Sequence, residues 1–291
     1  MPLKIEVAKE SSFCPGVDRA MKITEKTLLR KSGNVYSIGA LIHNPQVVKK
    51  LRGEGLRVLE PGDDFGDLDG ATVVVRSHGI DMNTERDLEH RGARLVDATC
   101  PTVKRAQEAA RELAGAGCDV VVIGSPTHPE VRSIVGRAGC QVAVVGTPEE
   151  AREWVLMRKP GRVGLVCQTT INRELLEDVR RELESLSDVE IRDTICESVG
   201  RRQREAMELA RRVDVMFVVG GRESSNTAQL AAISRRTGKP TYHVESPDEI
   251  EPGWLEGAGN AGVIGGASTP RWLIDETVKK LEELSAKISG E

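Results

Sequence analysis

The sequence predicts an α/β fold built from three copies of one unit. Three observations predict this fold: one cysteine motif occurs three times, a helical pattern follows each copy, and short apolar runs ending in glycine follow each helix. Alternation of helical and strand-like segments is typical of parallel sheets covered by helices. The chain of 291 residues, 39% hydrophobic and 30% charged, is also able to bury a core.

The repeated motif is C-x-x-V-x-R, and its cysteines are Cys14, Cys100 and Cys196. Apolar or small residues recur with helical spacing after each of them, and Pro15 and Pro101 suit the first turn of a helix. We therefore expect each cysteine at or near the amino end of a helix. Partial positive charge and free N–H groups favour a thiolate there.

A first set of strands carries one polar residue per copy. Apolar runs at 35–39, 120–124 and 215–220 are interpreted as buried strands that end in glycine. Four residues past the glycines, and 29, 28 and 28 residues past the cysteines, stand His43, His128 and Ser224.

A second set of strands follows in the same register. Helical segments at 46–51, 131–135 and 227–234 lead to strands at 71–75, 162–166 and 261–265. Seven residues past the first residue of each strand stand His78, Thr169 and Ser268. Coincidence is the alternative, but three positions at near-constant offsets favour a true repeat.

The repeat predicts three units. The first covers 1–97 with an N-terminal strand, the second 98–193, and the third 194–291 with a C-terminal helix. Ligands of open parallel sheets bind at the carboxyl ends of the strands, where all these residues fall. A pseudo-threefold arrangement would bring three thiolates onto one axis inside a ring of His, Thr and Ser.

Three converging thiolates suit zinc or an iron–sulfur cluster. A zinc site would usually be closed by a fourth protein ligand and be structural. A cluster is commonly held by four cysteines, so three would leave one iron able to take a substrate oxygen. Cys118, Cys140 and Cys167 lie outside the register and are interpreted as small buried hydrophobic residues.

Donor-rich loops predict an anion site, for a phosphate or diphosphate. Part of it, the glycine-rich stretch at 220–226, precedes a helix whose N–H groups can reinforce anion binding. No nucleotide-binding fingerprint is present. The expected anion-binding residues are His43, His78, His128, Ser224, Ser225, Asn226 and Ser268.

Glu130 is a candidate general acid, because a carboxyl group facing an anion pocket is expected to hold a proton. The alternative is an ordinary first-turn glutamate favoured by the helix dipole. Thr169 could relay a proton or orient the substrate. Arg76 and Arg222 are expected to be solvated or ion-paired, and His90 and His243 to lie on the surface.

Charge and composition exclude several classes of protein. The net charge of −4 and only eight aromatic residues argue against nucleic-acid binding. There is neither an apolar run of membrane-spanning length nor a signal-peptide pattern, so we expect a cytoplasmic protein without a membrane partner. Six cysteines without a C-x-x-C pair favour thiol or metal chemistry over disulfides.

These motifs together closely resemble the 4-hydroxy-3-methylbut-2-enyl diphosphate reductase family, also called IspH or LytB, from about residue 3 to residue 280. The matching segments are 43–45, 77–79, 97–101, 128–131, 168–170, 224–226 and 266–268, together with the single residues Phe13, Cys14, Gly16, Val17, Ile195, Cys196, Arg202 and Gln203.

The resemblance implies an oxidoreductase that performs the last step of the methylerythritol phosphate route to isoprenoids. The allylic alcohol diphosphate loses its hydroxyl in a two-electron, two-proton reduction that gives isopentenyl and dimethylallyl diphosphates. By the same resemblance one 4Fe-4S cluster, held by Cys14, Cys100 and Cys196, lies at the centre of a trefoil-like arrangement of the three units.

The resemblance also implies the remaining roles. Glu130 delivers the proton, Thr169 contacts the hydroxyl end of the substrate, and the donor-rich loops bind the diphosphate. The electron donor is a ferredoxin or a flavodoxin. Two other functions fit the residues alone: a zinc- or cysteine-dependent hydrolase of a phosphorylated metabolite, and a non-catalytic iron–sulfur sensor.

Overall fold

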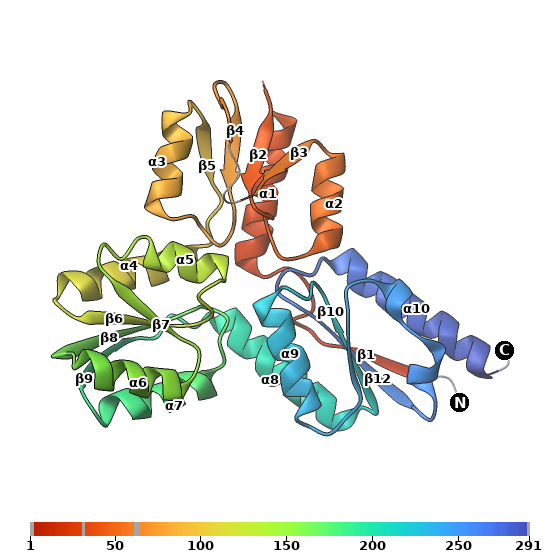
Figure 1. The fold of residues 1–291 in the computed structure, drawn as a ribbon. Coiled ribbons are helices and arrows are strands. Elements are labelled where there is room, and N and C mark those ends of the chain that lie inside the picture. Colours follow the sequence, from red (N-terminus) through yellow and green to blue (C-terminus); the bar gives the residue numbers. More distant parts are fainter. Residues whose placement is uncertain (1–2, 31–32, 61–64, 290–291) are drawn as a thin grey trace. The chain divides into compact units, whose positions relative to one another are not determined.

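The computed structural model describes residues 3–30, 33–60 and 65–289, and it contains three four-stranded parallel sheets (Figure 1). The predicted α/β class with three repeated units is confirmed. The helices are α1 (Pro15–Leu29), α2 (Pro45–Gly53), α3 (Met82–His90), α4 (Pro101–Gly115), α5 (Pro129–Val135), α6 (Pro148–Arg158), α7 (Arg173–Glu184), α8 (Glu197–Arg212), α9 (Ser225–Arg235) and α10 (Arg271–Ser289), with short 3-10 turns at Pro247–Glu249 and Pro252–Leu255.

The first two sheets have the same strand order. One has the order β3-β2-β4-β5 and the other β7-β6-β8-β9. All neighbouring strands in them are parallel. Their strands are β2 (Val35–Ile38), β3 (Leu56–Leu59), β4 (Thr72–Val75) and β5 (Arg94–Asp97), then β6 (Asp119–Ile123), β7 (Val142–Val145), β8 (Arg162–Cys167) and β9 (Asp188–Arg192).

The third sheet repeats this order only because the first strand of the chain completes it. Its order is β1-β12-β10-β11, and Lys4 of β1 pairs with Asn260 of β12. The strand that directly precedes each repeated cysteine, β1, β5 or β9, is therefore the edge strand of its sheet. The strands are β1 (Lys4–Val7), β10 (Val215–Val219), β11 (Thr241–Val244) and β12 (Asn260–Gly265).

The chain divides into two compact units. Unit 1 contains Met1–Asp18, Ile42–Leu51 and Glu197–Glu291, and so holds the third sheet. Unit 2 contains Arg19–Leu41 and Arg52–Cys196, and holds the other two sheets. The three-way division at residues 97 and 193 stays a prediction, although β1, which chain order groups with the first repeat, pairs in the sheet of the third.

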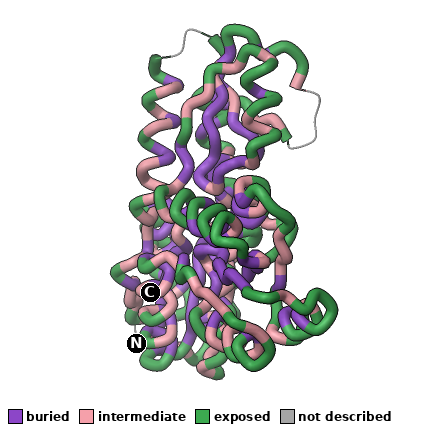
Figure 2. The backbone as a smooth tube through the Cα atoms, turned by 90° about the vertical axis from the view of Figure 1, so that its left-hand side faces the viewer, coloured by how far each residue is buried: buried purple, intermediate pink, exposed green. Residues whose placement is uncertain are grey.

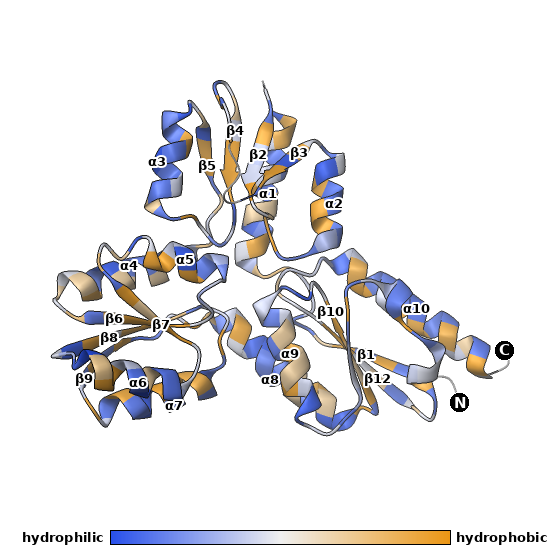
Figure 3. Cartoon of the chain, in the orientation of Figure 1, coloured by the Kyte–Doolittle hydropathy of each residue, from blue (hydrophilic) through white to orange (hydrophobic). Residues whose placement is uncertain are grey.

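Apolar side chains on both faces of the sheets form the cores. In unit 1, one face of β10 and β12 packs against α10 through Leu273 and Ile274, and the other against α8 and α9 through Leu209 and Leu230. In unit 2, β6 and β8 are covered by α6 and α7 on one face and by α4 and α5 on the other. The edge strands are partly exposed, whereas the two central strands of each sheet are mostly buried, and Figures 2 and 3 show such buried and apolar segments. Such strands read as continuous apolar runs, as the sequence predicted.

Among the helices of the described ranges, none combines the length and apolar character needed to cross a membrane.

Candidate active site

Each repeated cysteine directly precedes a helix, as predicted. Cys14 and Cys196 stand one residue before α1 and α8, and Cys100 is the N-cap residue of α4. The thiols of all three are half-buried. The amide N–H of Val17 donates to the Cys14 Sγ over 3.4 Å, so the first turn of α1 is oriented to stabilise negative charge on that sulfur.

A backbone hydrogen bond fixes each repeated cysteine to a loop that follows one of the second set of predicted strands. These are the loops that carry Ser268, His78 and Thr169. The Cys14 N–H donates to the Ala267 carbonyl, beside Ser268, over 3.0 Å. The Cys100 N–H donates to the Ser77 carbonyl, beside His78, over 2.9 Å. The register predicted from spacing is therefore a physical connection in two copies.

The third copy makes the same kind of connection. The Cys196 N–H donates to the carbonyl of Thr169 itself over 2.9 Å. Cys196 is thereby fixed beside Thr169 in unit 2.

The remaining cysteines were predicted to be buried, which is correct for two of them. Cys118 and Cys167 lie in the core, and burial raises the pKa of the Cys167 thiol to about 12. The prediction was wrong for Cys140, which is exposed just before β7. The apolar residues after Cys140 made it resemble part of the strand, but the strand begins two residues later.

Unit 2 brings together both of its predicted histidines. The rings of His78 and His128 meet edge to face, with centroids 5.5 Å apart and planes at 82°. The Nδ1 of His128, the N-cap residue of α5, accepts the N–H of Glu130 over 3.2 Å. A neutral His128 ring therefore carries its hydrogen on Nε2, where it can donate to an anion.

Glu130 lies in the same cluster and is almost completely buried, with 2% of its surface exposed. One carboxyl oxygen accepts the Thr169 N–H over 2.5 Å, and the other accepts the Thr169 hydroxyl over 3.0 Å. Burial raises the pKa of Glu130 to about 7, even though both hydrogen bonds from Thr169 favour the ionised form. Glu130 can thus hold or release a proton near neutral pH.

A buried hydroxyl that sequence reasoning missed connects these residues. The Ser133 Oγ contacts the carbonyl oxygens of His78 and Glu130 at 2.7 and 2.8 Å, and accepts the Gln107 amide N–H over 3.1 Å. Its one hydrogen is shared between the two carbonyls. A side chain at Gly79 would place a Cβ 2.6 Å from the Gln107 Nε2, and the φ of Gly79 is +73°, so only glycine suits this turn. Ser133 lies one turn past Glu130 on α5, and this spacing is the only feature of the sequence that could have indicated its place in the site.

Unit 1 brings together the predicted serines. Ser224 is the N-cap residue of α9, and its Oγ accepts the Thr227 N–H over 3.3 Å. The Ser268 hydroxyl donates to the His43 carbonyl over 3.1 Å and lies 3.5 Å from the Ser224 Oγ. A Cβ on Gly221 would approach the His43 carbonyl oxygen to 2.5 Å, so glycine permits these loops to meet.

Asn226, in the first turn of α9, is the most informative residue of this cluster. It is 97% buried, and within the described part of the chain neither its amide oxygen nor its amide nitrogen has a hydrogen-bond partner. Buried amides are normally satisfied, because an unmade hydrogen bond costs about 1–3 kcal/mol. Asn226 beside two serine hydroxyls and the amino end of a helix is suited to a polar, anionic ligand. Ser225, half-buried, is the first residue of the same helix.

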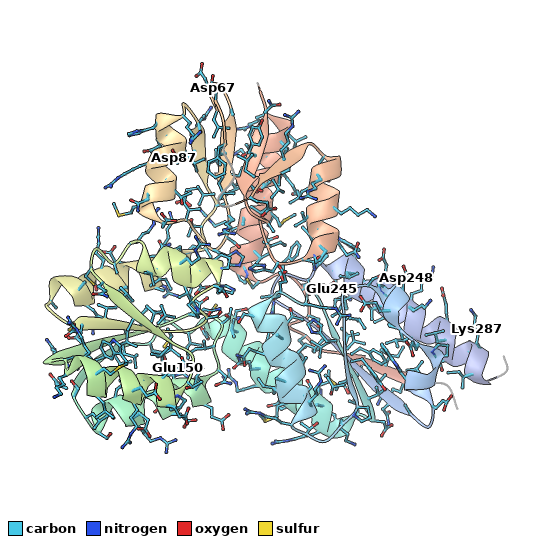
Figure 4. All side chains as sticks on the ribbon, viewed as in Figure 1. Asp67, Asp87, Glu150, Glu245, Asp248 and Lys287 are labelled. Carbon is cyan, nitrogen blue, oxygen red and sulfur yellow. The ribbon has the colours of Figure 1, made fainter. Side chains whose placement is uncertain are left out.

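The predicted surface residues differ in outcome. Arg222 is exposed and pairs with Glu245, labelled in Figure 4, and with Glu249, as expected. His90 is exposed. The prediction was wrong for His243, which is half-buried in β11 with its Nε2 2.9 Å from the Gly220 carbonyl oxygen; burial lowers its pKa.

Arg76 is a second correction. It was expected to be solvated or ion-paired, but it is 91% buried, and its Nε has no hydrogen-bond partner among the residues described. Burial, together with the charge of Arg132, lowers the pKa of Arg76 to about 10. Its place directly after β4 explains the error, because β4 ends inside the fold rather than at the surface.

The parallel sheets and these polar clusters at their carboxyl ends define an α/β enzyme of the kind that binds a small anionic ligand. Comparison with known families makes this specific. The family model described as LytB protein matches residues 5–282, and the chain belongs to that family. The family resemblance predicted from the sequence is confirmed.

Curated relatives match over nearly their whole length. The 4-hydroxy-3-methylbut-2-enyl diphosphate reductase of Pelobacter propionicus is 42% identical over 98% of this chain and 100% of its own. The reductase of the same name from Geobacter sulfurreducens is 41% identical over 99% and 100%, and that of Aquifex aeolicus 38% over 96% of each.

Two solved structures are also similar. One, of (E)-4-hydroxy-3-methyl-but-2-enyl diphosphate reductase, the terminal enzyme of the non-mevalonate pathway, is 38% identical, covers 97% of this chain and 99% of its own, and has a TM-score of 0.70. The other, of the E-1-hydroxy-2-methyl-but-2-enyl-4-diphosphate reductase from Plasmodium falciparum, is 22% identical, covers 96% and 88%, and has a TM-score of 0.86. The second supports the fold alone.

Proposed function

We propose that the chain performs the reaction for which its relatives are named: it is a 4-hydroxy-3-methylbut-2-enyl diphosphate reductase, the terminal enzyme of the non-mevalonate pathway. The observation that carries this conclusion is an identity of about 40% over essentially the full length of several curated reductases. The function predicted from the sequence is confirmed by the same match.

The three repeated cysteines suit an iron–sulfur cofactor. They are soft donors, each at the amino end of a helix and each fixed by a backbone hydrogen bond, whereas the other three cysteines lack this setting. We propose that Cys14, Cys100 and Cys196 hold one 4Fe-4S cluster. When bound, such a cluster supplies single electrons and a Lewis-acidic iron.

The donor-rich loops suit the diphosphate of the substrate. Asn226, Ser224 and Ser268 offer a buried amide and two hydroxyls, and Ser225 adds the first turn of α9. His43, His78 and His128 are proposed to complete the anion site. An anion bound here would accept a hydrogen bond from the Asn226 Nδ2, which has no partner within the described structure.

Glu130 is proposed to deliver the proton needed when the hydroxyl leaves as water. A carboxyl with a pKa of about 7 is protonated in a large fraction of molecules at neutral pH. Thr169 contacts both of its oxygens, so it can hold the carboxyl in place and contact the substrate hydroxyl. The reaction consumes two electrons and two protons, and releases water.

A one-electron protein donor is expected, because the cluster takes up electrons singly. We propose a ferredoxin or a flavodoxin in this role. The six cysteines, all within the described ranges, form no disulfide, which suits the reducing cytoplasm that we propose as the location of the protein.

Anaerobic purification with iron and sulfide analysis tests the cofactor. Cys14→Ser, Cys100→Ser and Cys196→Ser should each lose iron and the visible absorbance of the cluster. Cys118→Ser, which alters a buried core thiol, is the control and should retain both. Full iron content in all four variants would refute the ligand assignment, and a colourless wild type would favour a zinc- or cysteine-dependent hydrolase.

Reductant-driven turnover of the allylic diphosphate tests the activity itself. The expected products are isopentenyl and dimethylallyl diphosphates. A protein that holds the cluster but gives no product would instead be an iron–sulfur sensor.

A further inference from the structure

The segment that leads to Cys14 is held by side chains of α8. Residues 8–14 connect β1 to α1 and form no regular structure of their own. The Glu205 carboxylate accepts two consecutive backbone N–H groups from this segment, those of Lys9 at 2.5 Å and Glu10 at 2.9 Å. These two hydrogen bonds therefore connect the segment to a helix that lies almost 200 residues later in the chain.

Arg202 holds the other side of the same segment. Its guanidinium donates to the carbonyl oxygens of Glu10 at 2.9 Å and Ser12 at 2.5 Å, and lies 3.4 Å from the Glu10 carboxylate. Only 2% of Arg202 is exposed. A buried arginine is stable only where acceptors surround it, and here two of the acceptors are main-chain carbonyls just before Cys14.

The internal repeat shows that this arginine is not required by the helix. Six residues past the repeated cysteines, the first two copies have Ala20 and Ala106, both with 0% exposure. The third copy has Arg202 at this position. A small residue therefore fills the position where the helix needs only packing, and the arginine in the third copy serves the segment that it binds.

We propose that Arg202, with Glu205, is a positioning residue that sets the location of the Cys14 thiol. The inference rests on the proposed role of Cys14 as a cluster ligand. Residues 9, 10 and 12 are fixed by α8, and the Cys14 N–H is fixed by Ala267, so little freedom remains for the thiol between these anchors. Metal ligands require this kind of support from the residues behind them.

The test measures the thiols in the metal-free protein. Iodoacetamide labelling at fixed pH, followed by peptide mass spectrometry, gives a separate rate for each cysteine. Arg202→Lys retains the charge but cannot bridge both carbonyls, and Glu205→Gln keeps only one acceptor for the two N–H groups. Each should raise the labelling rate of Cys14 by about fivefold to tenfold through local opening, with Cys100 and Cys196 changed less than about twofold.

Arg212→Gln is the matched control. It removes an ion pair between the same helix and Glu6 of β1, but makes no contact with residues 9–12. It should leave all labelling rates unchanged. In the cluster-loaded protein, the two test variants should also release iron faster than this control.

An unchanged Cys14 rate in both test variants would overturn the proposal, and so would equal acceleration of all three cysteines, which would indicate general loosening. The proposed function fails separately: if Cys14→Ser keeps its full iron content, Cys14 is no ligand, whatever the labelling rates show.

Discussion

At the scale of single residues, Glu130 and Arg76 are both buried ionisable groups with opposite surroundings. Glu130 accepts two hydrogen bonds from Thr169, whereas the Arg76 Nε–H donates none to the described residues. Burial penalises the charged form of both, and so it raises the pKa of the acid and lowers that of the base. Only Glu130 is brought into the range where its proton can be exchanged at neutral pH.

The pH dependence of turnover tests Glu130. If Glu130 donates a proton, the reductant-driven rate should fall as pH rises through about 7, where the acid ionises. Glu130→Gln should bind substrate but react about 100-fold or more slowly, without this pH dependence. Near-normal turnover by that variant would exclude Glu130 as the acid.

The Glu130 carboxyl also predicts that the free energy of unfolding depends on pH. Its folded pKa is raised, so its stabilising contribution is complete below pH 4.5 and is lost as pH rises to about 7. That loss corresponds to about 3 kcal/mol. Denaturant titrations at several pH values should show the decline in the wild type, and Glu130→Gln should remove it.

Arg76→Met should leave the unfolding midpoint unchanged or raise it by a few degrees. The variant removes a buried guanidinium whose lowered pKa indicates a charge penalty of about 3 kcal/mol. Arg202→Met is the contrast, because it removes an equally buried guanidinium from its acceptors and should destabilise by about 3–5 kcal/mol. The thermal unfolding midpoints of both variants test this prediction. A large fall in the midpoint of Arg76→Met would contradict it, because it would show that the native Arg76 guanidinium has an acceptor that stabilises its charge.

At the scale of elements, the amino end of α9 combines a helix cap with a residue that is proposed to bind the anion. Ser224 caps the helix, and Asn226 keeps a buried amide without a partner inside the described fold. Such a group lowers stability and is retained where a ligand uses it. On the proposed function, the first turn of α9 would therefore bind the anion, whereas its later turns pack in the core.

Asn226→Ala should weaken the binding of inorganic diphosphate by about tenfold or more without loss of stability, because it removes an unsatisfied amide. Calorimetric titration and thermal unfolding measure the two effects. Ser234→Ala, which removes a buried hydroxyl further along α9, should leave the affinity unchanged. Equal affinity of Asn226→Ala and the wild type would exclude the amide from the anion site.

At the scale of the whole molecule, the three sheets have the same strand order, but the boundaries of the sequence repeat differ from those of the sheets. The strand β1 precedes the first repeated cysteine, yet it belongs to the third sheet. Spacing alone revealed the repeat, because Cys14, Cys100 and Cys196 are followed by polar residues at near-constant offsets. It could not reveal that β1 pairs with β12, because an edge strand of four residues has little pattern of its own.

The site was predictable to the same extent. Residues at fixed offsets, such as His78 and Ser268, could be named as candidates. Arg202 could be named only as part of the family resemblance, without a role, and Ser133 and the burial of Arg76 were missed, because they depend on which helix packs against which loop. Cys140 and His243 show the opposite error, since local sequence gives the type of element but not its exact end or its depth.

The position of β1 makes a circular permutant feasible. The Leu3 N–H donates to the Ser285 Oγ of α10 over 3.1 Å, so the two ends of unit 1 lie side by side. A short linker from residue 289 to residue 3, with new ends at residues 159–161 between α6 and β8, should preserve folding and iron content. Loss of both folding and iron content in this permutant would contradict the prediction. A control permutant with new ends at Ala261, inside the central strand β12, should lose both.

The pairing of Lys4 with Asn260 also sets an order of events during synthesis. Of the described strands β1 is synthesised first, and it stays unpaired until β12 has been synthesised. The other two sheets can form in the meantime, whereas the segment that carries Cys14 still lacks its hydrogen-bond partners in α8 and at Ala267. On the proposed ligand set, we therefore expect the cluster to be inserted only after β12 has been synthesised, and a product truncated before β12 should not retain iron.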